Sequence, residues 1–294
     1  MDHAQPRLTD ITFVAIDTET TGLHPIMHRL VEIGAIRFRL DGSETITYQS
    51  LINPQIPIPQ DVQQAHGITD RLVRGQPTVE QIMPHFIEFL GAADTILLAH
   101  NAPFDLGFLA LALLRLGIAC PPHDVFDTLD MARRLYPAWP SHSLEHVATR
   151  LKVANEAAHR ALPDARLDKE IFLEMLRRTP TLKSMADVLH VSQPLTFADT
   201  PVCATDPPAG FEALSTAIAE QCTITIVYEP GSQRPAPRMI TPCLVLKVHG
   251  VAYVIAHCHR SDAERTFRLD RIRGCWLDEG GMWRVRKGRE ASGG

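Results

Sequence analysis

The 294-residue sequence contains no apolar run close to the ~20 residues that a membrane-spanning helix requires. Its first residues include neither the basic segment nor the apolar segment of a secretory signal peptide. Its composition, 45% hydrophobic and 21% charged, is ordinary for a soluble globular protein. These observations predict a cytoplasmic protein with no membrane partner.

Paired cysteines are also missing. The six cysteines show no C-x-x-C pair and no spacing typical of a zinc site, so we expect free thiols in a reducing compartment. The triplet His257-Cys258-His259 is not expected to bind a metal, because neighbouring side chains of a strand point to opposite faces. Internal repeats, low-complexity tracts and a helix-turn-helix are absent as well, and the last absence disfavours a transcription factor.

Charge of the two signs is distributed unevenly. Residues 1–204 contain 17 Lys and Arg against 24 Asp and Glu, whereas residues 205–294 contain 12 against 10. The acidic first part suits a metal-dependent site, and the arginine-rich end suits contact with an anion or a phosphate backbone. The net charge of −5 by itself neither favours nor excludes nucleic acid as a partner.

The first part of the chain alternates between strand and helix patterns. Residues 30–40 and 45–52 alternate apolar and polar side chains around Asp41-Gly42, which predicts an antiparallel hairpin. Further short strands are expected at 13–16, 95–99 and 125–127. Helices are expected at 79–90, 104–116, 128–135, 143–151 and 159–177. This order predicts an α/β fold, a mixed sheet flanked by helices.

The second part reads as a separate domain. Residues 181–208 are rich in proline and lack periodicity, which predicts a linker between domains at 8–180 and 209–287. A helix is expected at 211–221, followed by short strands at 223–228, 238–248, 251–258, 265–269 and 275–277. Closely spaced short strands are typical of a small β-barrel.

Five side chains of the first domain are candidates for a shared site. Asp17 and Glu19 end a buried strand and point to the same face, where a divalent cation would relieve their repulsion. Taken alone, such a pair can equally be a solvated strand end. Asp105 begins a helix, and its carboxylate is favoured by the helix N-terminus. His159 and Asp164 would be separated by about 140° on one helix, so they reach one site only by straddling the face toward the sheet.

Three motifs lie within residues 11–178: Asp17-x-Glu19-Thr20-Thr21-Gly22, then His100-Asn101-Ala102-Pro103-Phe104-Asp105, then His159-Arg160-Ala161-Leu162-Pro163-Asp164. Together they resemble the motifs of the DnaQ-type, DEDDh family of 3′→5′ exonucleases. The resemblance implies an RNase H-like fold and a metal-dependent enzyme that releases nucleoside 5′-monophosphates from the 3′ end of single-stranded nucleic acid. DNA is the preferred substrate, and RNA trimming is the alternative.

The resemblance also implies the roles of the site residues. Two Mg²⁺ or Mn²⁺ ions would be held by Asp17, Glu19, Asp105 and Asp164, with His159 as the general base. The residues implied on the substrate side are Thr20, Thr21, Gly22, Leu23, His66, Asn101 and Phe104. A core role for Phe104 and a loop role for His66 are the alternatives, and we expect His100, His142 and His146 to be structural.

The second domain contains two characteristic segments, Arg238-x-Ile240-x-Pro242 and residues 265–272. They resemble a WYL domain, a small SH3/Sm-like β-barrel, with Ala252-Tyr253-Val254 in place of the Trp-Tyr-Leu triplet. The resemblance implies binding of nucleic acid or an anionic ligand by Arg238, Tyr253, Arg265, Arg268 and Arg271. One alternative is a charged rim with internal salt bridges. A second is a ligand-sensing regulator with residual nuclease activity.

A short segment between the two domains suggests a protein partner. Gln193-Pro194-Leu195-Thr196-Phe197 partly resembles the peptides with which some proofreading exonucleases bind a sliding clamp. The segment therefore predicts a clamp as a further partner.

Overall fold

The computed structural model describes residues 7–277 except 44, 155–158 and 232–233. The chain divides into two compact units, Met1–Thr200 and Pro201–Gly294. Residues 278–287 of the predicted second domain lie outside the described part. The boundaries predicted at 180 and 209 stay a prediction.

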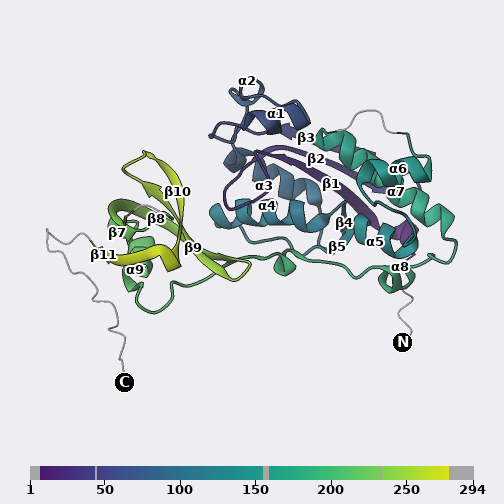
Figure 1. The fold of residues 1–294 in the computed structure, drawn as a ribbon. Helices are drawn as coiled ribbons and strands as arrows, with labels where there is room; N and C mark the ends of the chain where they lie inside the picture. Colours follow the sequence, from purple (N-terminus) through teal and green to yellow (C-terminus); the bar gives the residue numbers. More distant parts are fainter. Residues whose placement is uncertain (1–6, 44, 155–158, 232–233, 278–294) are drawn as a thin grey trace. The chain divides into compact units, whose positions relative to one another are not determined.

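A five-stranded mixed sheet forms the centre of the first unit, in the order β3-β2-β1-β4-β5 (Figure 1). β1 pairs antiparallel with β2 and parallel with β4, and β2 pairs antiparallel with β3, as the hairpin pattern predicted. The strands are β1 (Thr12–Thr20), β2 (Leu30–Arg39), β3 (Thr45–Leu51), β4 (Ile96–Ala99) and β5 (Val125–Asp127). Because β1 is central, its carboxyl end is surrounded by elements from distant parts of the chain.

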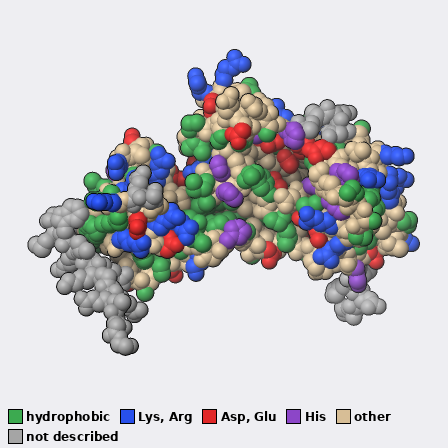
Figure 2. All heavy atoms as spheres, viewed as in Figure 1, with side chains coloured by type: hydrophobic (Ala, Val, Ile, Leu, Met, Phe, Trp, Pro, Cys, Tyr) green, Lys and Arg blue, Asp and Glu red, His purple; other side chains and the backbone are tan. Residues whose placement is uncertain are grey.

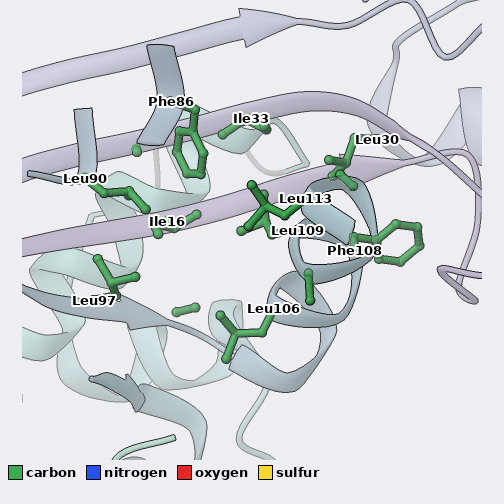
Figure 3. Close-up of a cluster of buried hydrophobic side chains, with 14 of the residues drawn as sticks. Ile16, Leu30, Ile33, Phe86, Leu90, Leu97, Leu106, Phe108, Leu109 and Leu113 are labelled. Carbon is green, nitrogen blue, oxygen red and sulfur yellow. The ribbon is translucent and has the colours of Figure 1, made fainter. Parts of the chain in front are cut away.

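Alternation along β1 assigns its side chains to two layers. Val14 and Ile16 face a core built with α3 (Val79–Leu90) and α4 (Ala102–Arg115), part of which Figure 3 shows. Phe13 and Ala15 face the opposite core. Three helices build that second core: α5 (Thr128–Leu135), α6 (Leu144–Leu151) and α7 (Ala161–Arg178). The first unit is therefore a sheet between two helical layers, as the predicted RNase H-like arrangement requires.

Shorter elements complete the first unit. A small buried cluster, which includes Val31 and Ile68, lies among β2, α1 (Gln60–His66) and α2 (Asp70–Val73). The segment predicted as a linker contains α8 (Met185–Val191), which packs on α5 through Val188. Its lack of long-range periodicity reflects the short length of these elements.

The second unit is an antiparallel sheet with one helix. The sheet order is β10-β9-β8-β7-β11, with β6 paired to β8. The elements are β6 (Val202–Ala204), α9 (Glu212–Glu220), β7 (Ile224–Tyr228), β8 (Ala236–Val248), β9 (Val251–Cys258), β10 (Ala263–Arg268) and β11 (Ile272–Leu277). Leu214 and Ala217 of α9 are buried in its core. Among the described residues no strand pair joins β10 to β11, so the closure expected of a barrel is not shown.

Within the part of the chain that the structure describes, no helix is both long and apolar enough to cross a membrane.

Candidate active site

The end of β1 presents two acids to the layer that contains α7. Asp17 and Glu19 continue the side of the strand that holds Phe13 and Ala15. The regular register with β2 is lost between Glu19 and Thr20, where the strand ends. The Thr20 hydroxyl donates to the Gly22 carbonyl at 2.7 Å and stabilises the turn that follows. Both carboxylates are partly buried at this strand end.

The first turn of α7 brings a third acid to the same place. One carboxylate oxygen from each of Asp17, Glu19 and Asp164 lies within 4.8 Å of the other two. Figure 2 shows acidic side chains gathered in a hollow of the first unit's surface. These three carboxylates, which we call the carboxylate cluster, come from residues up to 147 positions apart in the chain.

His159 lies beside this cluster but not on the helix. We expected one helix from 159, whereas α7 begins at Ala161 and His159 has a left-handed backbone with φ of 66°. Its backbone N–H donates to Asp164 Oδ2 at 2.9 Å. The predicted placement of His159 on the helix is therefore wrong, because His159 reaches the site through this turn and not along a helix face.

Asp105 approaches from the other helical layer. It lies in the first turn of α4, is buried, and accepts a hydrogen bond from the Thr18 hydroxyl at 2.7 Å. It is not one of the three acids whose oxygens lie within 4.8 Å of one another. Its charge is nevertheless close enough to raise the pKa of Asp17. No pattern in the sequence indicated the contact with Thr18.

Burial and mutual repulsion raise the pKa values of the acids at this site. Burial, then the charges of Asp105, Glu19 and Asp164, raises the pKa of Asp17 well above its ordinary value. Burial and the charge of Asp164 raise the pKa of Glu19 to about 8. Burial raises the pKa of Asp105 to about 7, against the hydrogen bond from Thr18. Carboxylates that repel one another and offer only oxygen ligands fit hard divalent cations, so the residues present fit Mg²⁺ or Mn²⁺.

Two family models match the chain. The model described as exonuclease (RNase_T) matches residues 14–172, more than half of the chain, and the WYL-domain model matches residues 209–275. The chain belongs to the exonuclease family. Both resemblances read from the motifs are thereby confirmed.

Individual relatives agree with the family match. A DNA polymerase III of the PolC type from Caldanaerobacter subterraneus subsp. tengcongensis is 35% identical over 181 residues, which are 61% of this chain and 13% of that protein. This chain therefore spans only a small part of its curated relative. The nuclease domain of 3′hExo, a DEDDh family member solved with rAMP, has a TM-score of 0.51 at 20% identity, over 57% of this chain and 92% of that one. Exonuclease I of E. coli, solved with a dT13 oligonucleotide, has a TM-score of 0.53 at 16% identity, over 80% of this chain and 55% of that one. Both solved structures share the fold.

The turn after β1 holds the first group of residues predicted on the substrate side. Thr20 and Thr21 are buried, and the Thr21 hydroxyl accepts from the Arg29 backbone N–H at 3.0 Å. Leu23 is 74% exposed at the tip of the turn. The first unit thus fixes the two threonines internally and exposes an apolar side chain in the turn that follows β1.

The remaining predicted substrate residues lie on two other elements. His66 is buried at the end of α1, and its Nδ1 accepts from the Ile68 backbone N–H at 3.0 Å. Asn101, with φ of 70°, caps α4, and its backbone N–H donates to Asp127 Oδ1 at 2.9 Å. The half-buried Phe104 ring packs against Phe108 with centroids 5.1 Å apart. These contacts are compatible with the loop and core alternatives, so substrate contact by these residues stays a prediction.

A buried polar network that the sequence did not reveal lies behind the acids. His100 bonds to Thr128 Oγ1 at 3.0 Å and to the His142 carbonyl at 2.8 Å, which agrees with the structural role expected for it. Thr128 also donates to Asp168. Burial raises the pKa of Asp168 to about 8. Its position four residues after Asp164, on the same helix face, was the only available signal.

The arginines predicted to bind a ligand in the second unit have different surroundings. Arg268 lies opposite Tyr253 and donates to both Asp270 oxygens, at 3.1 and 2.6 Å, as the salt-bridge alternative expected. Arg265 Nε donates to Ser261 Oγ at 3.2 Å. Because both lie on β10 three residues apart, their side chains point to opposite faces. Arg238 lies on β8 and Arg271 next to β11.

The predicted clamp-binding segment is used within the first unit. Leu195 and Val125 exchange two backbone hydrogen bonds of 2.8 Å, and Phe197 is buried in the core with α4. A clamp would have to withdraw the phenylalanine from this core. The structure therefore gives no support to a clamp as a partner.

A pH-dependent response to metal is expected from the raised pKa values. Because Glu19 and Asp105 bind protons more tightly when folded, the metal-free protein loses stability as the pH rises from about 4 to about 8. Mg²⁺ or Mn²⁺ bound only to the folded state opposes this loss, and at low pH must compete with protons. We expect excess Mn²⁺ to raise the Tm by about 5 °C at about pH 8 and by less at about pH 6. Thermal unfolding with EDTA or Mn²⁺ measures this, and equal shifts at both pH values would contradict it.

Proposed function

We propose that the chain is a metal-dependent 3′→5′ exonuclease that hydrolyses single-stranded nucleic acid to nucleoside 5′-monophosphates. The observation that carries the proposal is the carboxylate cluster of Asp17, Glu19 and Asp164, with His159 hydrogen-bonded beside it. Membership of the exonuclease family supports it. The family match supports an exonuclease. The proposal adds the 3′→5′ direction of hydrolysis, the single-stranded substrate and the nucleoside 5′-monophosphate products.

Different residues of the chain would bind the cations and accept the proton during hydrolysis. Asp17, Glu19 and Asp164 would hold the cations, with Asp105 completing the set from α4. Bound divalent cations would supply positive charge that favours ionisation of the attacking water and stabilises the leaving 3′ oxygen. The His159 imidazole would accept the proton from that water. Its backbone hydrogen bond to Asp164 fixes the turn that carries this side chain.

Substrate preference follows from the turn after β1 and from the relatives. Leu23 is exposed in the turn that follows Glu19 and would contact the terminal base, while Thr20, Thr21 and Gly22 would line the pocket for the terminal sugar. We propose DNA as the preferred substrate, supported by the DNA polymerase at 35% identity. The second unit would bind nucleic acid or another anionic ligand, supported by its WYL-domain match and by its excess of basic residues.

A digestion panel tests the enzymatic proposal. Oligonucleotides labelled at the 5′ end, as single-stranded DNA, duplex DNA with recessed ends and RNA, are incubated with Mg²⁺ or Mn²⁺, and released nucleotides are identified by mass. A ladder shortened from the 3′ end with 5′-monophosphates as products is expected, fastest on single-stranded DNA. Products bearing 3′-phosphates, or no release with either metal, would overturn the proposal. Faster RNA digestion would assign the chain to RNA trimming.

Substitution in the second unit tests its contribution to substrate binding. The double variant Arg265→Ala/Arg271→Ala is expected to weaken binding of long single strands and to lower the slope of log Kd against log salt by about 0.7 per lost phosphate contact. Hydrolysis of very short oligonucleotides should not change. Arg273→Ala is the matched control, because Arg273 pairs with Glu229. If the salt slope of the double variant is unchanged, the second unit more readily acts as a sensor of a small anionic ligand than as a binding site for the single strand.

A further inference from the structure

Glu32 is a fully buried acid near the start of β2. It is 0% exposed and lies directly opposite Glu19 in the β1–β2 register, on the sheet face toward α7. A buried carboxylate is costly unless it is paired and hydrogen-bonded. In the sequence it stands in an apolar strand, which gave no sign of its partners.

Four donors satisfy this carboxylate. Arg160 donates through Nε to Oε2 at 2.9 Å and through Nη2 to Oε1 at 2.6 Å. The Ala161 backbone N–H donates to Oε2 at 3.0 Å, and Gln49 Nε2 donates to Oε1 at 2.9 Å. Burial acts to raise the pKa of Glu32, but the hydrogen bonds from Arg160, Ala161 and Gln49 outweigh it and hold that pKa below its ordinary value. Glu32 is therefore ionised, and both of its carboxylate oxygens already accept hydrogen bonds from within the chain.

Gly34 provides an independent contact at the same place. It lies two residues after Glu32 and faces the same way. A Cβ on Gly34 would lie 2.2 Å from the Ala161 carbonyl carbon and from the Leu162 nitrogen. The first turn of α7 therefore rests directly on the backbone of β2, and only glycine permits this approach. Two contacts, one electrostatic and one steric, hold the same turn.

We propose that Glu32, Arg160 and Gly34 hold the start of α7 in place and so position His159 and Asp164 for catalysis. We call these three residues the clamp; the word denotes contacts within the chain and not a sliding-clamp protein. Arg160 is the N-cap residue of α7 and directly follows His159, whose left-handed backbone turns its N–H toward Asp164. Holding Arg160 against β2 fixes the turn that carries His159 and the helix start that carries Asp164. Glu32 and Arg160 are thus positioning residues. This inference rests on the proposed function of the same site.

A second role for Arg160 has to be separated from the clamp. Its side chain is 37% exposed and lines a groove of about 1050 Å³ together with Arg166 and Arg177. A guanidinium in such a place could contact a substrate phosphate directly. If Arg160 contacts the substrate directly, substitution of Arg160 should weaken substrate binding and substitution of Glu32 should not. If Arg160 acts through the clamp, substitution of either residue should impair the same positioning of His159 and Asp164.

The test compares Arg160→Gln, Arg160→Lys, Glu32→Gln and the double variant Glu32→Gln/Arg160→Gln. The clamp predicts that kcat falls about 10- to 100-fold with KM within about 2-fold, because the base is misplaced while substrate contacts stay. The double variant should lose no more than the worse single variant, since both substitutions break one unit. Lysine should recover part of kcat, because it keeps the charge but not the two-point geometry. Should Glu32→Gln fail to fold, the two Arg160 variants still decide.

Arg134→Gln is the matched control. Arg134 donates through Nε to both oxygens of Asp130, at 3.0 and 2.9 Å, on α5 and outside the groove, so the variant removes a comparable ion pair away from the site. Its kcat should equal that of the wild type. Hydrogen exchange supplies a readout that needs no activity: amides of residues 161–164 should exchange faster in Arg160→Gln and not in Arg134→Gln.

The outcomes separate this inference from the proposed function. An unchanged kcat in Arg160→Gln, or a raised KM in it with no effect of Glu32→Gln, would overturn the clamp while the nuclease assignment stands. If the wild type hydrolyses nothing, the proposed function fails. Hydrogen exchange then tests the clamp without any activity measurement. Unchanged exchange of the amides of residues 161–164 in Arg160→Gln rejects the clamp, and faster exchange in Arg160→Gln but not in the control variant supports it.

Discussion

Asp17→Asn is expected to lower kcat by about 1000-fold or more, equivalent to about 4 kcal/mol in the activation barrier. Asp17 belongs to the carboxylate cluster, and its pKa is raised by burial and by the charges of Asp105, Glu19 and Asp164. The amide keeps the shape of the side chain but removes one negative charge. The affinity for the cations should fall with it.

The same substitution should stabilise the metal-free protein. Removing one of several mutually repelling acids relieves their repulsion, so the Tm in EDTA at about pH 8 should rise. Activity lost together with stability gained distinguishes a missing ligand from misfolding. Asp41→Asn, in the exposed turn between β2 and β3, is the control and should retain activity. Wild-type kcat in Asp17→Asn would remove the basis of the nuclease proposal.

His159→Ala is expected to lower kcat by about 100- to 10,000-fold, the usual contribution of a general base. The cluster of Asp17, Glu19 and Asp164 is complete without His159, so the affinity for Mn²⁺ should stay close to that of the wild type. The backbone N–H that donates to Asp164 also persists in the variant. Single-turnover hydrolysis and calorimetric titration with Mn²⁺ measure the two quantities separately.

His85→Ala is the control for this substitution, because His85 is exposed on α3. It should change neither kcat nor the affinity for Mn²⁺. A variant His159→Ala that keeps its kcat would show that another group accepts the proton. A large loss of Mn²⁺ affinity would instead indicate that His159 contributes to the metal site.

Local patterns in the sequence determined much of the scaffold. The two-residue period placed Asp17 and Glu19 on one face of β1, and the 3.6-residue period delimited α3, because both periods depend only on near neighbours along the chain. The three exonuclease motifs and the two WYL-like segments identified both families, as the matches at 14–172 and 209–275 confirm. The mixed sheet between helical layers followed from the order of the elements.

Only the tertiary structure decided how distant residues meet. The left-handed turn at His159, the bond from Thr18 to Asp105, and the partners of Glu32 all join elements that have no fixed spacing in the chain. Phe197, which reads as a partner-binding residue in the sequence, lies in the core of the first unit. An amino-acid pattern fixes which way a side chain points from its own element, but burial and pairing depend on which other element packs against it.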